Sequence, residues 1–155
     1  MQRPAATVAT KLIRAAWGGT IADDEGRLRL LVPALALAVD TTVTIVPVAA
    51  GRAGSRVAFG AWRFIAYPGP AVLATGASLS VSIPADAPAA GLELLIANDA
   101  TALDDDWHPV PATLLADRWL DALTWYLPPS HGPPPTRSSA LICLAAKVPK
   151  AARGS

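Results

Sequence analysis

The chain has 155 residues, of which 52% are hydrophobic and 16% are charged, and its formal net charge is +1. This length fits one domain with a substantial hydrophobic core, and the composition is more apolar than that of an average soluble domain. A net charge so close to zero gives no electrostatic footprint for binding nucleic acid or an anionic membrane.

Cysteine content and the N-terminal segment bear on the compartment. A single cysteine, Cys143, excludes an internal disulfide and a cysteine-rich metal site. Lys11 and Arg14 interrupt the N-terminal segment, which therefore lacks the continuous apolar core of a signal peptide. No run of about 18 uninterrupted apolar residues occurs, so we expect no transmembrane helix and no membrane insertion. The expectation is a cytoplasmic protein by default, although an exported domain without disulfides fits the cysteine content equally well.

Alternating apolar and polar residues mark the strands expected in the first part of the chain. In the strand 27–32, Arg27 and Arg29 alternate with Leu28 and Leu30, and Pro33 ends the strand because it lacks an N–H donor. The acidic turn at residues 23–26 precedes it, and Gly26 supplies the positive φ of a hairpin. A second strand follows from Val43 to Val48. Helix is expected only as short turns at residues 7–17, 34–40 and 112–117.

The second part of the chain repeats this pattern of short strands and turns. Val57–Tyr67 holds one or two strands, and residues 78–83 alternate serine with apolar side chains. Further strands are expected at Leu92–Ala97, Trp119–Leu127 and Leu141–Val148. Turns at residues 68–70 and 98–99 are expected to separate these strands. The proline-rich segment 128–135 is expected to be an exposed connector. Together these features predict an all-β fold, an antiparallel β-sandwich of about seven to ten strands with little helix.

The order of these motifs resembles that of a known domain family. The motifs are Gly18-Gly19-Thr20, the acidic turn, the strand 27–32, Pro33, the segment Asp40–Val48, Tyr67-Pro68-Gly69 leading to Leu79–Pro84, and Trp107-His108-Pro109-Val110-Pro111. In this order they resemble the ZU-five-type domain of zonula occludens protein, netrin receptors and ankyrins, and its bacterial relatives. The resemblance covers residues 17–148, with residues 1–16 as an N-terminal extension and 149–155 as a C-terminal tail. It implies an immunoglobulin-like sandwich that binds proteins or acts as a scaffold, without enzymatic activity.

Two positions depart from the family pattern. Leu35 stands where members have a glycine after Pro-Ala, so we expect a helical turn there. Some relatives cleave themselves at a His-Phe-Ser site before the final strand. Here the comparable residues are Ser130-His131-Gly132-Pro133, and no hydroxyl follows His131 to attack the preceding carbonyl. Self-cleavage by that route is therefore not expected.

Candidate catalytic groups are few. Ser130 and His131 could form a nucleophile–base pair, but adjacent residues of an extended chain point apart, which favours a connector. Cys143 could pair with His108 or His131, but it lies in the apolar run LICLAA, where a cysteine usually packs as a small hydrophobe. We therefore predict no catalytic residues.

Acidic clusters and tryptophans suggest two kinds of binding site. Asp23-Asp24-Glu25 and Asp104-Asp105-Asp106 could hold calcium, but their places in the chain favour solvated turns. The five tryptophans, Trp17, Trp62, Trp107, Trp119 and Trp125, could include a carbohydrate-binding platform, although packing is the usual role of tryptophan in a sandwich. We predict a protein-interaction or scaffolding module without metal or cofactor. Carbohydrate binding and a degenerate self-cleaving domain are the alternatives.

Overall fold

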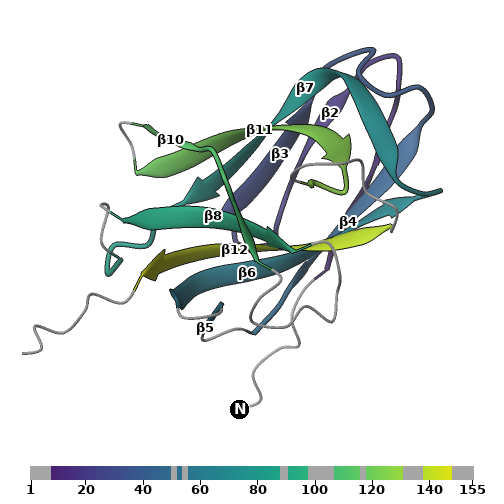
Figure 1. Ribbon diagram of the computed structural model, residues 1–155. Helices are drawn as coiled ribbons and strands as arrows, with labels where there is room; N and C mark the ends of the chain where they lie inside the picture. Colours follow the sequence, from purple (N-terminus) through teal and green to yellow (C-terminus); the bar gives the residue numbers. More distant parts are fainter. Residues whose placement is uncertain are drawn as a thin grey trace, which may run out of the picture.

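A computed structural model describes residues 8–49, 52–53, 56–87, 91–97, 107–115, 118–130 and 138–147 (Figure 1). Within these ranges the regular secondary structure consists of β-strands. The strands are β1 (Ala9–Ile13), β2 (Gly19–Ala22), β3 (Leu28–Val32), β4 (Thr41–Pro47), β5 (Arg52–Ala53), β6 (Arg56–Tyr67), β7 (Ala71–Ser82), β8 (Leu92–Ala97), β9 (His108–Val110), β10 (Thr113–Leu115), β11 (Trp119–Leu127) and β12 (Ser139–Lys147). The predicted all-β class is confirmed.

The strands form two antiparallel sheets that pack face to face. The seven-stranded sheet has the order β1-β4-β6-β12-β8-β9, with β5 paired to β6, and the five-stranded sheet has the order β10-β11-β7-β3-β2. The chain passes from one sheet to the other six times, and two of these passages, β1 to β2 and β9 to β10, join edge strands. Among the described residues, none lies in a helix long and apolar enough to cross a membrane.

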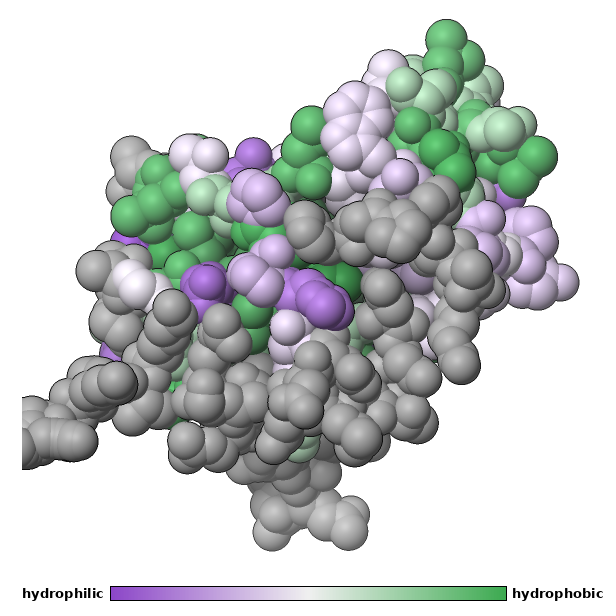
Figure 2. All heavy atoms as spheres, viewed as in Figure 1, coloured by the Kyte–Doolittle hydropathy of each residue, from purple (hydrophilic) through white to green (hydrophobic). Residues whose placement is uncertain are grey.

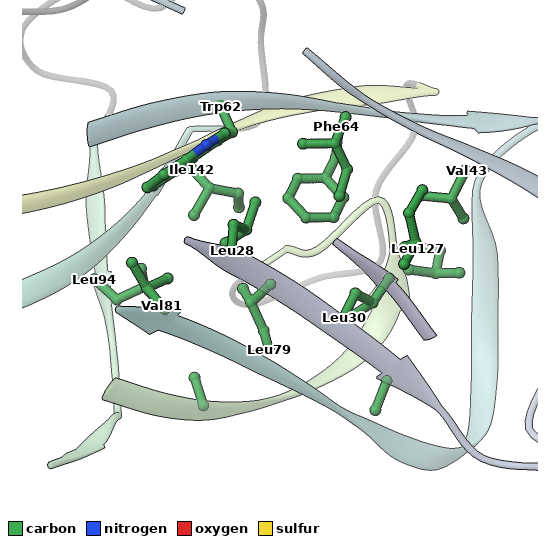
Figure 3. Close-up of a cluster of buried hydrophobic side chains, with 14 of the residues drawn as sticks. Leu28, Leu30, Val43, Trp62, Phe64, Leu79, Val81, Leu94, Leu127 and Ile142 are labelled. Carbon is green, nitrogen blue, oxygen red and sulfur yellow. The ribbon is translucent and has the colours of Figure 1, made fainter. Parts of the chain in front are cut away.

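The core lies between the two sheets and follows from the two-residue period of the strands. In β3, Leu28, Leu30 and Val32 are buried while the residues between them are exposed. Figure 3 shows leucines of the five-stranded sheet facing Trp62 and Phe64 of β6. Burying a side chain of this size stabilises the fold by about 1.5–3 kcal/mol relative to leaving it in water.

Strand β12 lies between β6 and β8 in the seven-stranded sheet, and each of its faces packs against a hydrophobic cluster. Ile142 and Leu144 point into the main core. Cys143 and Ala145 belong to a second, smaller cluster with Leu95. This double burial explains why the segment reads as a continuous apolar run rather than as an alternating one.

Several sequence-based expectations need correction. The segment expected to coil at residues 7–17 is mainly the strand β1, which pairs with β4. Only the turn after it is helix-like, because the N–H groups of Trp17 and Gly18 donate to the carbonyl of Arg14 at 3.2 and 2.8 Å. The sandwich therefore includes residues from the segment 1–16 that was expected to be an extension. β10 replaces the helical turn expected at residues 112–117, of which 116–117 lie outside the described residues. The range 57–67 is one long strand, and β7 begins at Ala71, well before the serine alternation.

The turn after Pro33 is also not helical. The N–H of Ala36 donates to the carbonyl of Pro33 at 3.3 Å, and Leu35 has a φ of 67°. These features describe a tight turn with a left-handed residue at its third position, where glycine is usual. Leu35 thus takes the conformation that a glycine would take.

Candidate binding surfaces

The candidate catalytic groups do not assemble among the described residues. Cys143 has no exposed surface, and its burial raises the pKa of the thiol to about 12, so it remains protonated near neutral pH. His108 lies on an exposed part of β9. Ser130 is 8% exposed rather than part of an exposed connector, and His131 lies outside the described residues. The buried position of Cys143 is therefore explained by packing rather than by a role as a nucleophile.

The first acidic cluster is not a uniformly solvated turn, because Asp23 is only 5% exposed. Its carboxylate accepts hydrogen bonds from the backbone N–H groups of Arg27 and Leu28 at 2.7 and 2.9 Å. A third bond comes from the Nε1–H of Trp62 at 3.0 Å. Trp62 belongs to the opposite sheet, so Asp23 ties the β2–β3 hairpin to β6.

The first acidic cluster shows no calcium-binding arrangement of its carboxylates. Asp24 and Glu25 are exposed in the turn, as predicted, whereas Asp23 directs its oxygens at N–H donors. Asp104-Asp105-Asp106 lies outside the described residues. Over the part of the chain that the structure describes, no group of three or more His, Cys, Asp or Glu side chains is placed to hold a metal ion.

The tryptophans divide between packing and exposure. Trp62 is buried in the main core, and Trp107 packs against the second cluster. Trp17 and Trp125 are 75% and 48% exposed, and Trp119 is half-buried. The expectation that packing dominates therefore holds for only part of the set.

Trp119 and Trp125 share the outward-facing phase of β11. Exposed and buried residues alternate from Trp119 through Trp125, with Leu120, Ala122 and Thr124 buried. A register shift between Thr124 and Tyr126 changes the phase only beyond this point.

The outer face of the five-stranded sheet brings polar and apolar side chains together. We define this outer face by Arg29, Leu31, Ser78, Ser80, Trp119, Asp121, Leu123 and Trp125. Pairing of β11 with β7 places Asp121 opposite Ser80, and pairing of β3 with β7 places Arg29 opposite Ser80 from the other side. Three neighbouring strands thus contribute to one surface.

Polar groups of the outer face satisfy one another. The hydroxyls of Ser78 and Ser80 donate to the same carboxylate oxygen of Asp121 at 2.6 and 2.8 Å. The guanidinium of Arg29 lies 4.1 Å from the ring centroid of Trp119, a cation–π distance. The sequence analysis did not identify these residues as a group, although the two-residue period of each strand could have placed them on one side.

Apolar side chains of the outer face remain open to solvent around this polar network. Leu123 is 56% exposed, Leu31 is 50% exposed, and Trp125 lies further along β11. Apolar area gathered beside preorganised polar groups is characteristic of binding surfaces.

Two sequence comparisons identify no relative of this chain. A scan of protein-family models finds no match for this chain, and a search of curated proteins finds no similar sequence. What the protein does is therefore inferred from the chemistry of its own surfaces.

Proposed function

We propose that the protein is a non-enzymatic protein-interaction module and that the outer face is its contact surface. The observation that carries this proposal is the stack of Arg29 on Trp119, flanked by the exposed Leu31 and Leu123. Tryptophan and arginine are enriched among the residues that dominate binding energy in protein interfaces. This role agrees with the scaffolding function that the resemblance to ZU-five-type domains implies.

Preorganisation of the outer face favours a protein partner. Asp121 already accepts two hydroxyl hydrogen bonds, so covering it does not strand an unpaired carboxylate. Arg29 is held against a ring, which reduces the side-chain entropy that binding would remove. The surface therefore offers apolar contact area at a low desolvation and ordering cost.

Affinity capture from the cells that natively produce the protein tests this proposal. Leu123→Asp places a charge in the outer face, and Leu12→Asp is the matched control, since Leu12 is 46% exposed on the edge strand β1 of the other sheet. We expect a protein that the wild type and Leu12→Asp both retain and that Leu123→Asp loses. Equal retention of every captured protein by the two variants would contradict the proposal.

Carbohydrate binding is the second candidate, favoured by the shared exposed phase of Trp119 and Trp125 on β11. A sugar would stack on the rings and bond to hydroxyl and carboxylate groups nearby. Arg29 covers one face of Trp119, however, which leaves Trp125 as the more open ring. Titration of tryptophan fluorescence with a panel of oligosaccharides tests this candidate, and a saturable change that Trp125→Ala abolishes would support it.

A further inference from the structure

One end of the sandwich carries a group of exposed apolar side chains that come from different turns. We call Trp17, Leu35, Val39, Tyr67 and Val72 the apolar tip. Trp17 lies between β1 and β2, Leu35 and Val39 lie between β3 and β4, and Tyr67 and Val72 flank the turn between β6 and β7. The β1–β2 and β3–β4 turns lie at the upper right of Figure 1, where Figure 2 shows hydrophobic surface, and the β6–β7 turn lies below them at the right margin.

Hydrogen bonds join these turns into one unit. The N–H of Leu35 donates to the carbonyl of Ala15 at 2.9 Å, and the N–H of Ala74 donates to the carbonyl of Ala36 at 2.8 Å. The turn with Trp17 also packs closely on β3, because a Cβ on Gly18 would lie 2.2 Å from the carbonyl oxygen of Val32. The apolar tip is therefore held in place by backbone contacts.

Exposure distinguishes the apolar tip from the rest of the described surface. Trp17, Leu35, Tyr67 and Val72 are 75%, 72%, 71% and 61% exposed, and they are the four most exposed large hydrophobic residues in the described part of the chain. Their placement together at one end differs from the scattered single apolar residues that are normal on a protein surface.

Leu35 is the most informative member of this group. Its φ of 67° is unfavourable for any residue with a Cβ, and a leucine gains nothing from that conformation. With 72% of its surface exposed, little burial offsets this strain. Strained residues persist where function requires them, so a contact outside the fold accounts best for a leucine here.

Charges along the molecule indicate the chemistry of that contact. Asp40, an acidic group at this end, lies 4.0 Å from Arg14 and accepts a hydrogen bond from the N–H of Ala15 at 2.8 Å. Lys11 on β1 adds a second cation, whose Nζ donates to the carbonyl of Thr20. The exposed acidic residues Asp24 and Glu25 lie in the β2–β3 turn, at the opposite end of these strands.

We propose that the apolar tip binds the surface of an anionic phospholipid bilayer. Leucine and valine side chains then enter the boundary of the acyl region, the aromatic residues lie at headgroup depth, and Arg14 and Lys11 face the lipid phosphates. Binding of this kind is peripheral, which differs from the membrane insertion that the sequence analysis did not expect. The net charge of +1 gave no footprint for an anionic membrane, because the tip forms only when distant turns meet.

Co-sedimentation with vesicles tests the proposal. The wild type is expected to bind mixed phosphatidylcholine–phosphatidylserine vesicles and to bind pure phosphatidylcholine vesicles more weakly. Leu35→Gly removes one inserted side chain while keeping the turn, and we expect about tenfold weaker binding. Leu114→Ser is the matched control because Leu114 is 50% exposed on the edge strand β10, outside the apolar tip and the outer face, and it should bind as the wild type does.

Three outcomes would overturn the proposal. The first is wild-type protein that stays in the supernatant with the mixed vesicles. The second is equal binding by Leu35→Gly and the wild type, or an equal loss in Leu114→Ser. The third is a dimer in analytical ultracentrifugation that Leu35→Gly dissociates, since a second copy would then occupy the tip. None of these results bears on the protein contact proposed for the outer face, which Leu123→Asp tests separately.

Discussion

Replacing Leu35 with glycine should not destabilise the protein, although it removes a whole side chain. The left-handed conformation costs about 1–2 kcal/mol for a residue with a Cβ. Since Leu35 is 72% exposed, the burial that is lost amounts to about 0.5 kcal/mol. Glycine also gives the unfolded chain extra freedom, which costs about 0.5–1 kcal/mol. These terms nearly cancel, so Leu35→Gly should unfold within about 0.5 kcal/mol of the wild type.

Leu35→Ala separates the two contributions, because alanine loses the side chain but keeps the Cβ and its strain. We expect Leu35→Gly to be more stable than Leu35→Ala by about 0.5–1 kcal/mol, measured by urea unfolding at equilibrium. For a chain of this size the difference corresponds to about 2 °C in Tm. A glycine variant less stable than the alanine variant would refute the assignment of a strained, functionally retained leucine.

Further predictions concern the core, the hydrogen bonds of Asp23 and the buried thiol. Phe64→Ala should lower the free energy of unfolding by about 3–5 kcal/mol in urea titrations, because Phe64 is fully buried between the sheets; a loss below about 1 kcal/mol would contradict the packing. Trp62→Phe should cost about 1–3 kcal/mol in the same assay, because it removes the Nε1–H donor from buried Asp23, and a neutral result would mean that this bond contributes nothing. Burial in the folded protein raises the pKa of Cys143 from 9.0 to about 12. The contribution of the protonated thiol to the free energy of unfolding is therefore fully present below pH 9 and is lost as the pH rises from 9 to 12. Native alkylation of Cys143 at neutral pH should accordingly be slow and become fast on unfolding, and rapid native labelling would contradict its burial.

Sequence patterns predicted the strands that have a strong local signal. Leu92–Ala97 and Trp119–Leu127 match β8 and β11 in their bounds, since a compact apolar run and a clear alternation each specify a strand without help from distant residues. β1 was missed because its five residues, ATKLI, alternate weakly and acquire strand pairing only beside β4. Local pattern and tertiary pairing agree in the first case and conflict in the second.

Residues of the binding surfaces were harder to predict because folding brings them together from distant segments. The sequence indicated that Asp23 is a solvated turn residue, because its hydrogen-bond donor Trp62 lies 39 positions away in the chain. The apolar tip likewise draws its members from three turns that meet only in the folded chain. Leu35 carried the strongest local signal, since it replaces an expected glycine, but only the observed φ shows that the glycine-like conformation is kept.

Site-specific photo-crosslinking in the cells that produce the protein tests the central claim most directly. A photoreactive residue at position 123, on the outer face, should give a discrete adduct with another protein. The same residue at position 25, in the exposed β2–β3 turn, should not give that adduct. The same adduct from both positions, or none from position 123, would contradict a protein contact on the outer face of the five-stranded sheet.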